Sequence, residues 1–112
     1  NDEPPVFKPA AKVIFLGKVL QSEVITKSKK GASWEVMQIV FATKKENISI
    51  NTDPQKGAWL LTLLPKLGLQ NQQMLTMQEI KDSYEQQGFE DFELFWDNKP
   101  ISTLYKAGLL KL

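Results

Sequence analysis

Three lysines stand close together in the first half of the chain, shortly before a tryptophan. Lys27, Lys29 and Lys30 lie within four positions, and Trp34 opens the next stretch of β-type residues. Lysine ammonium groups neutralise phosphates, and an indole ring stacks on an exposed nucleobase. These residue types at this spacing favour contact with an unpaired nucleic-acid strand.

Further lysines and one more ring extend this candidate surface. Lys18, Lys44 and Lys45 would continue the positive charge if the neighbouring segments pair as strands, and Phe41 is a weaker stacking candidate. Each has an ordinary alternative, because exposed turns are polar and aromatic rings commonly fill cores. Trp34 itself suits a core as well as a base. The candidate nucleic-acid-binding residues are Lys18, Lys27, Lys29, Lys30, Trp34, Phe41, Lys44 and Lys45.

Three residue types are missing from the chain, and their absence narrows the function classes. Without histidine and cysteine, the sequence lacks the usual metal ligands, the common general base and the thiolate nucleophile. We therefore expect that the protein is not an enzyme and that it binds neither a metal ion nor a cofactor. All 14 basic residues are lysine, so the bidentate arginine contact to guanine is ruled out and sequence preference should be low.

Length and composition indicate one globular domain. The chain has 112 residues, of which 42% are hydrophobic and 24% charged. We expect an extended lead-in over residues 1–10 and a single domain over 11–112. No apolar run approaches the ~20 residues of a membrane-spanning helix, which predicts a cytoplasmic protein with no membrane partner. Charge is uneven: residues 1–66 carry +4 and residues 67–112 carry −3.

The first half of the domain reads as strands. One long strand is expected from residue 11 to Lys27, with Gly17 marking a bend inside it. A hairpin tip is expected over residues 28–33, and Lys27, Lys29 and Lys30, at or next to this tip, are called the tip lysines. The second strand of the hairpin covers residues 34–43, and a short third strand covers residues 47–51. In the second strand, alternate residues beginning with Trp34 share one face, and those beginning with Glu35 share the other.

Two helices and a C-terminal hairpin complete the expected elements. Asp53 and Pro54 predict the start of a helix that ends at Gly68, with its last turn distorted by Pro65. Thr76 and Glu79, three positions apart, predict a capping box for a helix over residues 77–87. Residues 92–96 and 101–105 alternate as a strand pair, which would place Phe92, Leu94 and Trp96 inside.

This order of elements predicts a mainly β fold. A long bent strand, two further strands, a helix and two final strands are typical of the five-stranded Greek-key barrel known as the OB-fold. The first helix would lie between strands three and four, and the second would be an insertion before strand four. An α+β sheet with both helices on one side is the main alternative, since the sequence fixes element order better than strand pairing.

The hairpin and the first helix together resemble a known family. The run from Gly17 through Ser28-Lys29-Lys30-Gly31 to Trp34, with Asn51-Thr52-Asp53-Pro54 and Leu63-Leu64-Pro65-Lys66-Leu67-Gly68-Leu69, is similar to small single-stranded-DNA-binding proteins of bacteriophages. The hairpin alone also resembles the protein that coats the single strand of filamentous phages. This resemblance, over residues 12–69, implies sequence-independent binding of single-stranded DNA in phage replication or recombination. RNA binding, self-association and a replication or recombination protein as partner are left open.

A different function class rests on the C-terminal half. Residues 89–97 interleave aromatic rings with carboxylates, which would suit a protein-interaction or assembly module. Glu90, Asp91 and Glu93 could hold Mg²⁺ in principle, but adjacent residues of a strand point to opposite faces, which argues against a metal site. Replacing the tip lysines should separate the two functions, because only nucleic-acid binding depends on them.

Overall fold

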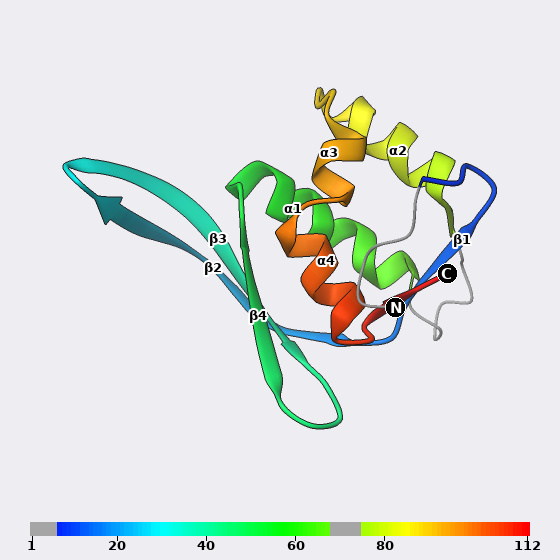
Figure 1. The fold of residues 1–112 in the computed structure, drawn as a ribbon, viewed down its shortest axis with the longest axis horizontal. Helices are drawn as coiled ribbons and strands as arrows, with labels where there is room; N and C mark the ends of the chain where they lie inside the picture. Colours follow the sequence, from blue (N-terminus) through cyan, green and yellow to red (C-terminus); the bar gives the residue numbers. More distant parts are fainter. Residues whose placement is uncertain (1–6, 68–74) are drawn as a thin grey trace.

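The computed structural model describes residues 7–67 and 75–112 and shows a mixed α/β fold (Figure 1). Its strands form two antiparallel sheets of three strands each, not a closed barrel. The smaller sheet has the order β5-β1-β6, with β1 at Lys12–Phe15, β5 at Leu75–Thr76 and β6 at Leu110–Lys111. The larger sheet has the order β2-β3-β4, so the five-stranded barrel expected from the sequence is not what forms.

The larger sheet is a long hairpin with a short third strand beside it. β2 covers Lys18–Lys29, β3 covers Ala32–Ala42 and β4 covers Asn47–Thr52. The hairpin closes through Lys30 and Gly31, whose φ angles of 53° and 83° fit the type I′ turn that matches strand twist. β4 pairs with β3 only from Met37 onward. We call the rest of the hairpin, residues 25–36, the arm, and it extends away from the body (Figure 1).

The expected bend at Gly17 is confirmed, and it separates what the sequence suggested was one strand. β1 belongs to the smaller sheet and β2 to the larger, with Gly17 between them. A Cβ at Gly17 would lie 2.7 Å from Leu109 Cδ2 and 3.1 Å from the Phe15 ring, so close packing explains the glycine. The register shift of β2 occurs after Val19, at Leu20.

Both predicted helix starts are confirmed. Asp53 accepts hydrogen bonds from the backbone of Gln55 and Lys56 and caps α1, which spans Pro54–Leu63. The chain continues as the 3-10 helix η1 over Leu64–Leu67, which agrees with the distortion expected at Pro65. The expected end at Gly68 lies outside the described residues. Thr76 and Glu79 form the capping box of α2, which spans Met77–Gln86.

The predicted C-terminal hairpin is wrong, because both of its strands are helices. α3 covers Phe92–Trp96 and α4 covers Lys99–Lys106, with Asn98 accepting a hydrogen bond from the Lys99 backbone at the start of α4. Phe92, Phe95 and Trp96 are all buried, as expected of one helical face, whereas Leu94 is 77% exposed. Without these two strands, no barrel can close.

A single hydrophobic core runs from β1 to β6, and aromatic rings dominate one side of it. Tyr84 of α2 lies 5.2 Å from Phe95 in a stacked arrangement and 5.0 Å from Trp59 edge to face, measured between ring centroids. Trp59 and Phe15 are buried in this core. Of the lead-in, Phe7 packs edge to face on Phe92. Within the described part of the chain, no helix has the length and hydropathy to cross a membrane.

Candidate nucleic-acid interface

The pairing of β2 with β3 decides which candidate residues share a face. Directly paired residues of an antiparallel ladder lie on the same face, and Lys27 pairs with Trp34 while Lys29 pairs with Ala32. Lys18 pairs with Ala42, an even number of positions from Trp34 along β3, and so lies on that face too. We call it the outer face. It carries Lys18, Gln21, Glu23, Ile25, Lys27, Lys29, Ala32, Trp34, Val36, Gln38, Val40, Ala42, Asn47, Ser49 and Asn51.

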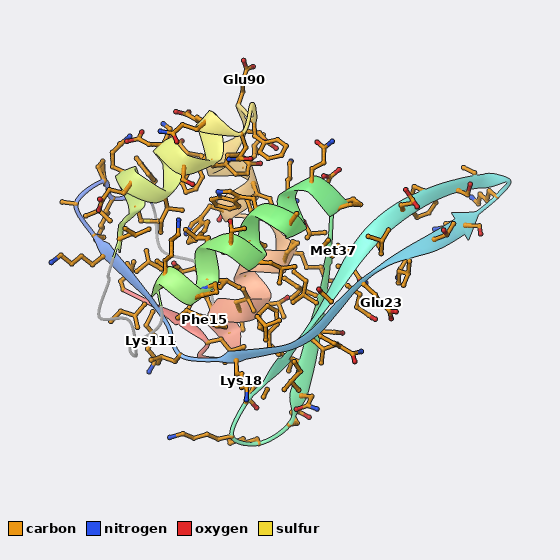
Figure 2. All side chains as sticks on the ribbon, turned by 180° about the vertical axis from the view of Figure 1, so that it is seen from behind. Phe15, Lys18, Glu23, Met37, Glu90 and Lys111 are labelled. Atoms are coloured by element: carbon orange, nitrogen blue, oxygen red, sulfur yellow. The ribbon has the colours of Figure 1, made fainter. Side chains whose placement is uncertain are left out.

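The opposite, inner face packs on helix α1. Met37 lies so near Gly57 that a Cβ on that glycine would be 2.7 Å from Met37 Sδ. Figure 2 shows Met37 on the side of the sheet toward α1 and Glu23 on the other side. The helix therefore leaves the outer face uncovered.

Trp34 and the tip lysines come together on the arm. Every residue from Thr26 to Glu35 is exposed, and 45% of the surface of Trp34 is accessible to solvent. Trp34 is thus not a core residue. Among the described residues Lys27, Lys29 and Lys30 form no ion pair. An uncovered indole with unpaired ammonium groups beside it can stack a base and neutralise the flanking phosphates.

Phe41 was expected as a weaker stacking residue, and the structure excludes it. Its side chain has no exposed area, and its ring lies 5.8 Å from that of Phe15, edge to face. Phe41 is on the inner face because it is an odd number of positions from Trp34 along β3.

Lys44 and Lys45 lie at the other end of the sheet. They are in the turn from Thr43 to Glu46, where Thr43 Oγ1 accepts hydrogen bonds from the backbone of Lys45 and Glu46. At ~3.3 Å per residue, the length of β3 separates them from the arm tip by about 33 Å. Lys18 lies at this same end. The lysines therefore form two groups, one at each end of the outer face, rather than one continuous cluster.

The surface between these two groups is polar but nearly neutral. Gln21, Gln38, Ser49 and Asn51 offer amide and hydroxyl groups to a passing backbone. Glu23 is the one carboxylate on the outer face, and Glu35 lies on the inner face. The chain has no arginine to read guanine, and these amides can hydrogen-bond to a backbone or to base edges, so the contact that is independent of sequence comes from the charge of the two lysine groups.

Two lysines at the base of the hairpin were not among the residues expected to form the site. Lys106 lies in the last turn of α4, and Lys111 lies in β6. Both line a surface groove together with Lys18, Lys44 and Lys45. Their charge was the one signal in the sequence that could have indicated them. Their position depends on α4, and the alternating residues 101–105 of this helix had been expected to form a strand.

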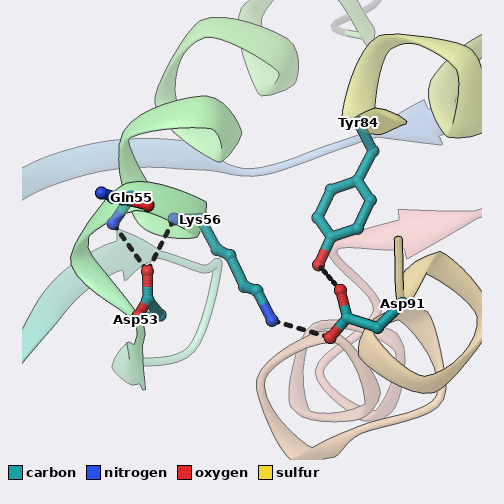
Figure 3. Close-up of polar contacts among 5 residues, drawn as sticks. All are labelled: Asp53, Gln55, Lys56, Tyr84 and Asp91. Carbon is teal, nitrogen blue, oxygen red and sulfur yellow. Dashed lines mark hydrogen bonds and ion pairs between the residues drawn. The ribbon is translucent and has the colours of Figure 1, made fainter. Parts of the chain in front are cut away.

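The carboxylate segment near residue 91 has a structural role. Asp91 Oδ1 accepts a 2.6 Å hydrogen bond from the buried Tyr84 hydroxyl, and Lys56 Nζ lies 2.8 Å from Asp91 Oδ2 (Figure 3). The hydrogen bonds from Lys56 and then Tyr84 lower the pKa of Asp91, while burial and this carboxylate raise the pKa of Tyr84. No group of three or more metal-ligating side chains occurs in residues 7–67 and 75–112.

No protein-family model, curated protein or solved structure matches this chain. Any functional conclusion therefore rests on the residues and their geometry.

Proposed function

We propose that the outer face of the hairpin binds single-stranded DNA without marked sequence preference. The observation that carries this proposal is the register of the arm, in which Lys27 pairs directly with an exposed Trp34 and Lys29 follows on the same face. The indole provides a stacking platform, and the ammonium groups hold the phosphates on either side of the stacked base.

An unpaired strand fits this surface better than a duplex. Stacking on Trp34 requires a base whose face is free, and in a duplex both faces are covered by neighbouring base pairs. The arm has lysine but no arginine, so it supplies charge rather than the planar fork that reads guanine in a major groove. RNA single strands offer the same two groups and belong in the same test.

The biological role that we propose is taken from the resemblance of the residue pattern over 12–69 to small phage proteins, not from the geometry of the outer face. Under this proposal the protein protects or organises single strands during phage replication or recombination, in the cytoplasm of the infected cell and without catalysis. A second copy of the chain and a replication or recombination protein are its proposed protein partners.

The first test removes the stacking platform. Trp34→Ala should weaken binding of a fluorescent oligothymidine about 5- to 150-fold at low salt, which corresponds to ~1–3 kcal/mol per stacked base. Trp34→Phe should retain most of the affinity because it keeps a ring. Val24→Ala is the matched control, since Val24 is 48% exposed but lies on the inner face of the hairpin.

The second test removes charge from the same face. In the double variant Lys27→Gln/Lys29→Gln, the slope of log affinity against log salt should become shallower by about 1.4, at ~0.7 per phosphate contact. The proposal is refuted if the unmodified protein does not bind single-stranded DNA or RNA at low salt, or if its affinity is indifferent to salt.

A protein-interaction function remains the second candidate, and it now rests on Leu94. The C-terminal hairpin on which it was based does not form, and Phe95 is buried. Leu94, in contrast, is 77% exposed and lines a shallow surface hollow together with the acidic residues Glu90 and Glu93. Leu94→Ala should leave oligonucleotide binding unchanged. If the chain binds no nucleic acid, an apolar and acidic docking surface around Leu94 becomes the better explanation.

A further inference from the structure

A surface groove of about 620 Å³ opens at the base of the hairpin, far from the arm tip. It is bordered by the link between β1 and β2, the turn between β3 and β4, the end of α4 and strand β6. Five lysines and a single carboxylate, Glu46, line it. The lysines are Lys18, Lys44, Lys45, Lys106 and Lys111.

Hydrogen bonds hold the backbone on each side of this groove. The Leu16 N–H donates to the Leu109 carbonyl at 2.7 Å, and the Leu109 N–H donates to the Leu104 carbonyl at 2.9 Å. On the opposite side, Thr43 and Glu46 close the β3–β4 turn with a 3.0 Å backbone hydrogen bond. The lysines therefore project from fixed backbone positions rather than from free loops.

The charge in the groove is not balanced from within the described part of the chain. The five lysines come from four separate segments, and none of them forms an ion pair within the described residues. Ammonium groups gathered in one hollow repel one another and raise the local concentration of anions. Lys106 has an ordinary reason for its position, since a cation stabilises the last turn of a helix. The other four do not have that reason.

The lining of the groove contains apolar side chains as well as lysines, and we call these apolar side chains its floor. Leu16, Ile48 and Leu109 contribute to its lining. An occupant with charged groups spaced along a less polar chain fits this combination, because ammonium groups meet the charge while the aliphatic side chains meet sugar or base. A polynucleotide has this character, and a bare inorganic ion does not use the apolar floor.

We propose that this groove binds the phosphate backbone of the same strand whose base stacks on Trp34. This inference rests on the proposed function and extends its site from the arm past the far end of the outer face into the groove, whose lining also includes the inner-face residue Ile48 and the end of α4. Lys18 connects the two parts, since it lies on the outer face and also lines the groove. The path of about 33 Å corresponds to roughly 10 nucleotides at ~3.4 Å per stacked nucleotide.

The test compares two oligothymidines, one of about 5 and one of about 15 nucleotides, chosen to fall on either side of the ~10-nucleotide path. Quenching of Trp34 reports occupancy of the arm, because Trp59 and Trp96 are buried. The variant is Lys44→Gln/Lys111→Gln, which leaves Lys106 in place for α4. Lys12→Gln/Lys99→Gln is the matched control, since it removes the same charge from exposed positions outside the groove.

We expect the groove variant to weaken binding of the long oligonucleotide and to make its salt slope shallower by about 1.4, while the short one binds as before. The slope of the unmodified protein should be about −2 for the short strand, from three tip lysines, and about −5.6 for the long one, from the three tip lysines and the five groove lysines. The control should leave both strands unaffected.

Three outcomes would overturn the inference while leaving the arm proposal standing. In the first, the groove variant binds the long strand like the unmodified protein. In the second, the control weakens binding equally, which would show a general charge effect. In the third, millimolar inorganic phosphate or vesicles containing phosphatidylserine abolish the difference between long and short strands, which would assign the groove to another anion. If neither strand quenches Trp34, the proposed function itself fails.

Discussion

Asp91→Asn tests whether the contact among Lys56, Tyr84 and Asp91 holds three helices together. Lys56 belongs to α1, Tyr84 to α2, and Asp91 immediately precedes α3. The substitution keeps the shape and one acceptor oxygen but removes the negative charge. We expect the folded state to lose stability, because one donor then meets a neutral oxygen and the other meets the amide NH₂, which cannot accept a hydrogen bond.

The size of the loss follows from the exposure of the partners. The side chains of Lys56 and Asp91 are 23% and 40% exposed, so solvent screens the ion pair and it contributes about 1 kcal/mol at most. Changing the 2.6 Å hydrogen bond from Tyr84 from charged to neutral costs about 1 kcal/mol more. The free energy of unfolding should therefore fall by about 1–2 kcal/mol at neutral pH.

The loss should depend on pH with a definite sign. The pKa of Asp91 is lowered in the folded protein, so the unfolded chain takes up a proton first as the pH falls. The stabilisation is complete well above the ordinary aspartate pKa of about 3.9 and is lost as the pH falls below it, through the lower folded value. The gap between the two proteins should therefore narrow at about pH 3.

Urea unfolding followed by the fluorescence of the buried Trp59 and Trp96 measures this gap. The midpoint of the variant should lie about 0.5–1 M below that of the unmodified protein at pH 7. Asp97→Asn is the control, because Asp97 is exposed and should shift stability by less than about 0.5 kcal/mol. Equal midpoints for Asp91→Asn at pH 7, or a gap that persists undiminished in acid, would contradict this account of the contact.

Three further predictions concern stability and binding. Gly57→Ala should cost about 1–2 kcal/mol in thermal or urea unfolding, because the new Cβ would lie 2.7–3.2 Å from three Met37 atoms; a gain in stability would contradict this contact. Tyr105→Phe should be neutral or stabilising by up to about 1 kcal/mol in the same assay, since the buried Tyr105 hydroxyl makes no hydrogen bond of good geometry among the described residues and has the Trp96 side chain as a polar neighbour; a clear loss would reveal a hydrogen bond between the two. Glu23→Gln should tighten oligonucleotide binding a few-fold in a gel-shift titration, since it removes the carboxylate from the outer face. Glu35→Gln on the inner face should not, and equal effects would argue against the outer face as the binding surface.

Local signals in the sequence predicted local structure well. Asp53 before Pro54 and Thr76 before Glu79 identify both helix starts, because a cap depends only on residues within one turn. The hairpin itself was also predicted, but its tip is shorter than expected: the strands run to Lys29 and from Ala32, so the turn is Lys30–Gly31 rather than residues 28–33. The sequence therefore indicated that Lys27 and Trp34 lie at the same end of the hairpin, while their direct pairing comes from the structure.

The C-terminal elements could not be read in this way. Alternation of Phe92, Leu94 and Trp96 fits a strand, but the spacing of Phe92, Phe95 and Trp96 fits a helix equally well. When residues 92–96 are helical, Phe95 stacks on Tyr84 of α2. This contact joins two separate helices, so the local sequence pattern does not reveal it. The basic groove was hidden for the same reason, since its position depends on where α4 and β6 lie in the fold.

The arm makes no use of the core that stabilises the rest of the protein. Its residues from Thr26 to Glu35 are all exposed, and within residues 7–67 and 75–112 the contacts that hold them in place are those of the β2–β3 ladder. The backbone amides of the arm should therefore exchange with deuterium through local opening, well before those of the buried residues Ile39 and Phe41. We accordingly expect substitutions of exposed arm residues to change what the arm binds while the melting temperature of the body stays the same.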